Sequence, residues 1–132
     1  MSRGYIQSNT SVHFINYHFV WCPKYRKRVL NDKIRKRLEE LIRQKIKEIN
    51  CEILSLSISE DHVHLFVQAN PKLSANYVIG QVKGYTSNVL RKEFQELRSK
   101  LPTLWTRSYF ASTHGHISDD MIKKYIEEQT GM

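Results

Sequence analysis

The hydrophobic residues of the chain gather in short, dense runs that predict a sheet. Residues 12–22, 51–59 and 62–68 are rich in β-branched and aromatic types, as strands are. Residues 104–111 predict a loop leading into a fourth strand. The connection Ser59-Glu60-Asp61 is short enough for a hairpin, so we expect the second and third strands to pair.

Between these runs the apolar residues fall three and four positions apart, which predicts amphipathic helices. One helix follows a cap at Asn31 or Asp32 and runs to about residue 49, and a second runs from a Ser74 cap to about Leu97. In the second helix we expect the buried stripe to comprise Val78, Val82, Tyr85 and Val89. A last helix, capped at 118–120, extends through Gln129.

The resulting order, β-α-β-β-α-β-α, predicts an α+β, ferredoxin-like fold (split βαβ, RRM-like) with helices on one face of an antiparallel sheet. Its length of 132 residues suits a single domain, 1–132. Strand residues two apart share a face. If the apolar sets Leu54, Leu56, Ile58 and Val63, Leu65, Val67 meet the helices, the opposite, open face carries His62, His64 and Phe66, joined by Asn16 and His18 if the register holds.

The composition of the chain is basic. Twenty-one Lys and Arg against 13 Asp and Glu give a formal net charge of +8, which favours an anionic partner, most often a nucleic acid. The two cysteines, Cys22 and Cys51, have no metal-type spacing and indicate reduced thiols in a cytoplasmic protein. We expect no signal peptide and no membrane-spanning segment.

The motif with the most chemical content is His62-Val63-His64. Two imidazoles on one face of a strand can bind one divalent ion, although such a pair is also common as ordinary polar surface. Tyr125 and Gln129 lie four residues apart on one face of the last helix, offset from Ile122 and Ile126. A phenol can act as a nucleophile, and a carboxamide oxygen suits Mg²⁺ or Mn²⁺.

Together, Asp61–Leu65 and Tyr125–Gln129 resemble the motifs of the single-tyrosine HUH transposases of the insertion-sequence-200 type, which are TnpA-like. The similarity extends along nearly the whole chain, through the stretches 20–26, 84–87, 104–109 and 115–118. Either motif alone is weak, but the combination is fairly specific.

The resemblance implies a metal-dependent strand transferase that acts on single-stranded DNA with hairpins at the ends of an insertion sequence. It implies that His62, His64 and Gln129 hold Mg²⁺ or Mn²⁺ and that Tyr125 is the nucleophile, leaving a 5′-phosphotyrosine link and a free 3′-hydroxyl. It also implies a homodimer with composite active sites, in which the tyrosine helix acts in cis or in trans.

Basic residues supply candidate DNA contacts. The cluster Lys24, Arg26, Lys27 and Arg28, with Tyr25 inside it, suits phosphate contact and base stacking. Isolated basic residues are weaker candidates: Lys83, Arg91 and Arg107.

Three alternatives stay open at the level of sequence. A non-catalytic ferredoxin-like nucleic-acid-binding module would use the same sheet face. A zinc hydrolase would combine His62 and His64 with His114 and His116, although four nitrogen ligands would make a structural site. A replication-initiator-type nuclease shares the HUH chemistry.

Overall fold

A computed structural model describes residues 6–7, 12–113 and 118–130. Their main feature is a four-stranded antiparallel sheet in the order β4-β5-β3-β6. Its strands are β3 (Ile15–Trp21), β4 (Glu52–Ile58), β5 (Val63–Ala69) and β6 (Phe110–Ser112), and a separate short pair joins β1 (Ile6–Gln7) to β2 (Val12–His13). This strand order is the ferredoxin-like arrangement, and the predicted fold class is confirmed.

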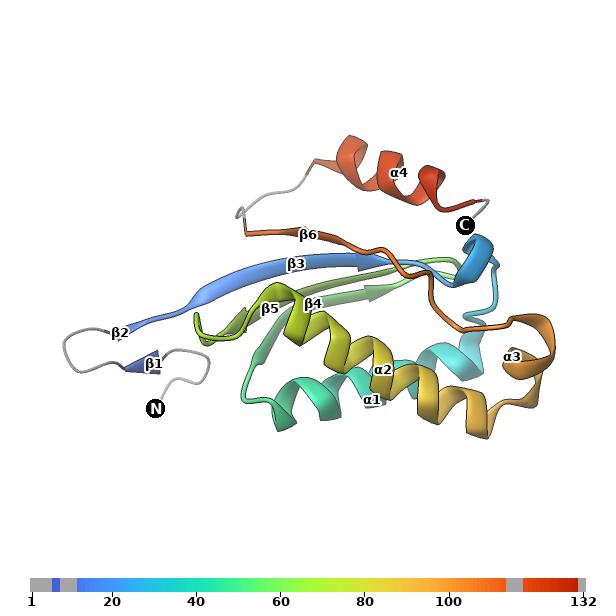
Figure 1. Ribbon diagram of the computed structural model, residues 1–132, viewed down its shortest axis with the longest axis horizontal. Helices are drawn as coiled ribbons and strands as arrows, with labels where there is room; N and C mark the ends of the chain where they lie inside the picture. The colour runs from blue at the N-terminus through green and yellow to red at the C-terminus, as the bar shows by residue number, and fades with distance from the viewer. Residues whose placement is uncertain (1–5, 8–11, 114–117, 131–132) are drawn as a thin grey trace.

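Helices lie on both faces of the sheet. In Figure 1, α1 (Asp32–Glu48) and α2 (Ala75–Glu93) cover one face, and α4 (Asp119–Glu128) lies across the other. The face expected to be open is therefore partly covered by the last helix. A 3-10 turn, η1 (Lys24–Arg26), follows β3, and the short helix α3 (Gln95–Lys100) follows α2.

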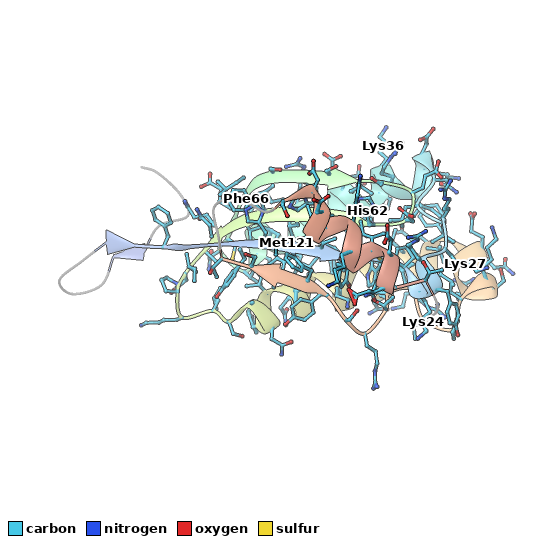
Figure 2. All side chains as sticks on the ribbon, turned by 90° about the horizontal axis from the view of Figure 1, so that it is seen from above. Lys24, Lys27, Lys36, His62, Phe66 and Met121 are labelled. Carbon is cyan, nitrogen blue, oxygen red and sulfur yellow. The ribbon has the colours of Figure 1, made fainter. Side chains whose placement is uncertain are left out.

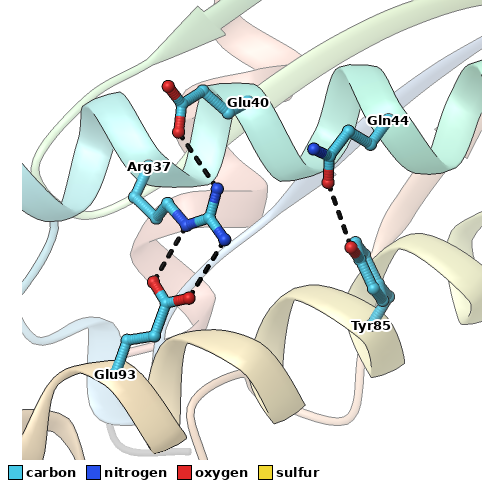
Figure 3. Close-up of polar contacts among 5 residues, drawn as sticks. All are labelled: Arg37, Glu40, Gln44, Tyr85 and Glu93. Atoms are coloured by element: carbon cyan, nitrogen blue, oxygen red, sulfur yellow. Dashed lines mark hydrogen bonds and ion pairs between the residues drawn. The ribbon is translucent and has the colours of Figure 1, made fainter.

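The core forms between the sheet and the α1–α2 layer. Alternate residues of β3 and β5, including Phe19, Trp21 and Leu65, are fully buried against Leu38 and Val82 of the helices. At the exposed rim of this layer, Arg37 forms a bidentate ion pair with Glu93 (2.9 and 3.0 Å), and the Tyr85 hydroxyl donates to Gln44 Oε1 (3.0 Å; Figure 3). These contacts tie α1 to α2.

Side-chain caps start the helices where the sequence predicted them. Asn31 accepts a hydrogen bond from the Ile34 amide, Ser74 from the Tyr77 amide, and Ser118 from the Met121 amide. The second helix is shorter than expected: it ends at Glu93 because Phe94 is extended (φ −121°, ψ 99°), and α3 begins after it.

Two packing predictions were wrong in detail. Leu54 does not join Leu56 and Ile58 on the core face, because an irregularity between Ile53 and Ser55 shifts the register of β4 and leaves Leu54 exposed. In α2 the fully buried stripe passes through Ile79, Thr86 and Leu90 as well as Val78 and Val82, while Tyr85 and Val89 are only partly buried.

Among the described residues, no helix combines the length and the apolar character that a membrane span requires.

Candidate active site

The two predicted histidines lie at one end of the sheet, on the side of α4. His64 is in β5 between the fully buried Val63 and Leu65, so its side chain points to the opposite face. His62 precedes β5, in the β4–β5 turn that the Ser59 amide closes by donating to the His62 carbonyl (2.9 Å). Both side chains are half-buried.

A third histidine joins them from the neighbouring strand. His18 is buried in β3, its ring stacks on Phe66 (3.8 Å between centroids, 10° between planes), and its Nδ1 is 3.3 Å from His64 Nε2. His18 pairs with Phe66 across β3 and β5, so the two side chains lie on the same face of the sheet, as predicted. This histidine therefore borders the expected metal-binding pair.

The ring of His62 is oriented by a carboxylate that the sequence pattern did not single out. Asp61 Oδ1 is 3.0 Å from His62 Nδ1, and Arg26 Nε is 3.5 Å from Asp61 Oδ2. When Nδ1 carries the proton and donates it to Asp61, Nε2 keeps its lone pair, and the Ser59 hydroxyl lies 3.4 Å from that atom. A carboxylate behind an imidazole is the usual support of a metal-binding histidine.

The environment of His64 favours its neutral form. Burial lowers the pKa of His64 below its ordinary value, and the nearby His18 and His62 lower it further. A neutral imidazole is the form that binds metal ions. The donor chemistry of His62 and His64 therefore fits a divalent cation.

Tyr125 and Gln129 face the sheet, contrary to the expectation that they are offset from the buried side of the last helix. Gln129 is only 4% exposed and Tyr125 is half-buried beside Phe110 of β6 (6.2 Å between ring centroids). The Gln129 Nε2 donates to the Tyr125 carbonyl over 3.2 Å. Both side chains thus belong to the contact between α4 and its own sheet.

Ser108 connects these two residues. Its Oγ donates to Gln129 Oε1 over 2.6 Å and lies 3.2 Å from the Tyr125 hydroxyl. Burial raises the pKa of Tyr125 above its ordinary value. Nothing in the sequence pattern singles out Ser108, because it lies in an irregular segment.

That segment is held tightly against the end of β3. The Thr106 amide donates to the Cys22 carbonyl (3.0 Å), and the Trp105 indole donates to the Thr86 hydroxyl (3.1 Å). Lys83 Nζ reaches it from α2 and donates to three consecutive carbonyls, those of Thr106 (2.7 Å), Arg107 (3.4 Å) and Ser108 (3.1 Å). Burial lowers the pKa of Lys83 to about 8.

The candidate DNA contacts differ in availability. Lys83 and Arg91 were candidate DNA contacts, but the Lys83 ammonium donates to those three carbonyls, and Arg91 donates to the Leu101 carbonyl (2.9 Å). Arg107 is exposed. In the cluster 24–28, Tyr25 and Lys27 are exposed, Arg26 faces Asp61, and Arg28 lies 3.9 Å from Glu60. Figure 2 shows Lys24 and Lys27 at the same end of the molecule as His62.

The histidine group and the Tyr125 group lie on the same face and toward the same end of the sheet. In Figure 1 the C-terminal end of α4 lies over the end of the sheet where β5 begins, and Figure 2 shows His62 beside α4 from above. Val20, the partner of both His64 and Phe110 in the sheet, is fully buried on this side.

Within residues 6–7, 12–113 and 118–130, no group of three or more His, Cys, Asp or Glu side chains lies in a position to hold a metal ion. The zinc alternative that uses His114 and His116 falls outside the described residues and stays a prediction.

Fold and site together define a class: a ferredoxin-like domain with paired histidines at one end of its sheet and a tyrosine on a helix across the same face. The family model "Transposase IS200 like" matches residues 11–129. The chain belongs to this family, which supports a transposase function and confirms the resemblance seen in the sequence.

Individual relatives agree. The chain is 30% identical over 129 residues to the ISDra2 transposase TnpA of Deinococcus radiodurans, covering 96% of this chain and 88% of that protein. It is 31% identical over 117 residues to the transposase for insertion sequence element IS200 of Salmonella typhimurium, covering 85% and 77%.

Two solved structures share the fold. A candidate transposase from Deinococcus radiodurans R1 superposes with a TM-score of 0.85 at 28% identity, covering 94% of this chain and 97% of that one. A REP-associated tyrosine transposase bound to a REP hairpin superposes with a TM-score of 0.59 at 12% identity, covering 93% and 68%. At that identity the second match bears on the fold alone.

Proposed function

We propose that this chain is a DNA transposase that cleaves and rejoins single-stranded DNA at the ends of an insertion sequence, through a 5′-phosphotyrosine intermediate. The observation that supports the proposal most is the position of Tyr125. It lies on a helix that packs over the same sheet face, and toward the same end, as His62 and His64. Family membership supports the coarser part of the proposal, a transposase function.

His62, His64 and Gln129 are the residues that would hold a divalent cation, Mg²⁺ or Mn²⁺. The support for this is chemical: His62 has a carboxylate behind its Nδ1, and His64 is biased toward its neutral form. A bound ion of this kind supplies Lewis-acid polarisation of the scissile phosphate and offsets charge on the leaving oxygen.

Tyr125 performs the covalent step. Its phenolic oxygen attacks the phosphorus as the phenol loses its proton, the bond between phosphorus and the 3′-oxygen breaks, and that oxygen leaves as a 3′-hydroxyl. The 5′-phosphate stays on Tyr125. A 3′-hydroxyl can then attack the phosphotyrosine and release the tyrosine, so the number of phosphodiester-type bonds is conserved and no external energy source is needed.

The basic turn formed by residues 24–28 is the proposed phosphate-binding surface. It borders the histidines, since Arg26 contacts Asp61, and it keeps Lys27 and Tyr25 exposed for phosphate and base contacts. We include a hairpin in the proposed substrate; the REP-associated tyrosine transposase that shares this fold is bound to a REP hairpin. We also propose that the protein is a homodimer with composite active sites. Within the single chain, α4 packs on its own sheet through the Ser108–Gln129 hydrogen bond and the contact between Phe110 and Tyr125.

The test is to incubate the protein with single strands that carry hairpins and flanking sequence, in the presence of Mg²⁺ or Mn²⁺, and to look for strand cleavage with a covalent protein–DNA adduct. Tyr125→Phe should abolish both while leaving hairpin binding intact. Tyr109→Phe is the matched control, because Tyr109 is a half-buried tyrosine whose hydroxyl contacts Asn76 (3.3 Å). If the wild type binds such strands but never cleaves them, the chain is a non-catalytic binding module instead.

A further inference from the structure

We propose that Ser108 is a positioning residue for the transposase reaction, which directs the Tyr125 hydroxyl through a hydrogen-bond chain that ends on Gln129. The inference rests on the proposed function, since it gives a task to a residue beside the proposed nucleophile. Neither the HUH motif nor the tyrosine motif contains Ser108.

The direction of the chain follows from counting protons. A serine hydroxyl has one proton to donate and lone pairs to accept. Ser108 gives its proton to Gln129 Oε1, at 2.6 Å, so its contact with Tyr125, at 3.2 Å, is made with the phenol as donor. The Tyr125 proton is therefore directed at Ser108, and the phenolic lone pairs point elsewhere.

Gln129 completes the chain because its amide is fixed at both ends. Its oxygen accepts from Ser108, its nitrogen donates to the Tyr125 carbonyl, and the side chain is 4% exposed. A hydroxyl that donates to a good acceptor becomes a better acceptor itself, so the bond to Gln129 strengthens the pull of Ser108 on the phenolic proton. The effect on Tyr125 is orientation of the phenol and polarisation of its O–H bond.

The position of Ser108 is set from the far side of the sheet. Lys83 donates to the carbonyls of residues 106, 107 and 108, and Thr106 Oγ1 donates to the Ser108 carbonyl over 3.2 Å. These bonds restrict the backbone at Ser108 and so fix its hydroxyl at the position where it contacts Tyr125 and Gln129 of α4. Functional groups that work at fixed distances are usually supported in this way.

The experiment compares Ser108→Thr with Ser108→Val, two side chains of nearly equal shape that differ in the hydroxyl. Single-turnover adduct formation is measured at saturating hairpin DNA with Mn²⁺, together with hairpin affinity and thermal stability. We expect Ser108→Thr to stay near the wild-type rate and Ser108→Val to be slower than Ser108→Thr by about 10- to 100-fold, the cost of removing one or two hydrogen bonds. Hairpin affinity should be the same in both.

The affinity for Mn²⁺, measured by calorimetry, is the independent readout. It should agree within about twofold between the two variants, because both leave His62 and His64 in place and both keep Gln129, the third proposed ligand, held by the bond from its Nε2 to the Tyr125 carbonyl. Equal adduct rates in the two variants would overturn the proposal. A Mn²⁺ affinity that falls in parallel with the rate would also overturn it, since Ser108 would then act on the metal site.

A further variant and the wild-type reaction complete the experiment. Ser108→Ala, which brings no added branch, replaces the valine variant if that protein is less stable than the threonine variant, and its rate is expected to fall in the same range. If wild-type protein forms no adduct at all, the proposed function fails; if it does and the Thr and Val or Ala variants match it, only the role of Ser108 fails.

Discussion

The Oγ of Ser108 donates a hydrogen bond to the Oε1 of Gln129 over 2.6 Å, across the contact between the segment before β6 and the end of α4. This bond joins residues 21 positions apart; Gln129 is buried and Ser108 is half-buried. It fixes the C-terminal end of α4 over the sheet, and with it the side chain of Tyr125 one turn earlier. The same amide oxygen that suits a hard cation also contributes to the docking of the helix.

Gln129→Leu should therefore destabilise the protein. Leucine fills the space but removes both hydrogen bonds of the buried Gln129 amide, those with the Ser108 hydroxyl and the Tyr125 carbonyl, so we expect the free energy of unfolding to fall by about 1–3 kcal/mol in urea denaturation. Gln95→Leu, at an exposed position that begins α3, is the control and should change stability little. An equal effect of the two substitutions would show that the Gln129 amide does not support α4.

Lys83→Met should cost stability and leave DNA binding unchanged. Its ammonium bonds three carbonyls, and methionine keeps most of the chain length but none of these donors, so we expect a loss of about 1–3 kcal/mol in the free energy of unfolding. Lys92→Met, on an exposed position of the same helix, is the control. A variant with normal stability but weakened hairpin binding would show that Lys83 contacts DNA, as the sequence alone suggested.

The basic turn should govern the salt dependence of binding. Replacing Lys24 and Lys27 by Ala removes two charges near His62, and the slope of log affinity against log salt should become shallower by about 0.7 for each DNA phosphate that these lysines neutralise in the wild type. Lys92→Ala with Lys100→Ala removes the same charge from exposed positions on α2 and α3. If both pairs of substitutions reduce the slope equally, DNA affinity depends only on the net charge of the protein, and the basic turn is not a specific DNA-binding surface.

The thiols give a pH-dependent prediction. Burial raises the pKa of Cys51 to about 11, so the folded protein keeps this thiol protonated at pH values where the unfolded chain has ionised it. A pKa raised on folding contributes stability that is present below the unfolded pKa and is lost as pH rises. The unfolded chain has the ordinary thiol pKa of 9.0. Between pH 8 and pH 10, about one pH unit either side of that value, the free energy of unfolding of the wild type should therefore fall relative to that of Cys51→Ala.

Urea denaturation of both proteins at the two pH values measures this shift. Lys83 and Cys22 titrate in both proteins, so their contributions cancel in the comparison. A stability difference that stays constant with pH would mean that Cys51 is not shielded from solvent as its 7% exposure indicates.

The main features of the fold and the site follow from local patterns in the sequence. Alternation in β5 placed His64 opposite the buried Val63 and Leu65, and the caps at Asn31, Ser74 and Ser118 set the starts of three helices. These features depend on residues a few positions apart, so a periodicity argument reaches them. The register of β4 was missed because an irregularity at Leu54 breaks the alternation that the argument assumes.

The supporting residues of the site could not be found in this way. Ser108 meets Gln129, Lys83 meets the 106–108 carbonyls, and Arg26 meets Asp61 through contacts between distant segments. No spacing rule connects such pairs. The one local signal was Asp61, next to His62 in sequence, because a carboxylate beside a metal-binding histidine is a common support. Tyr125 and Gln129 were expected to be offset from the buried face, but they face the sheet, where Ser108 of the segment before β6 and Phe110 of β6 contact them.

The measurement that tests the central claim most directly is the mass of the peptide that carries Tyr125 after reaction with a hairpin-bearing single strand and Mn²⁺. Digestion after Lys124 yields a peptide beginning at Tyr125. After nuclease treatment, we expect this peptide to carry the added mass of a 5′-linked nucleotide in the wild type and to remain unmodified in Tyr125→Phe. Cleaved DNA with an unmodified Tyr125 peptide, or an adduct on a different residue, would contradict the proposed reaction.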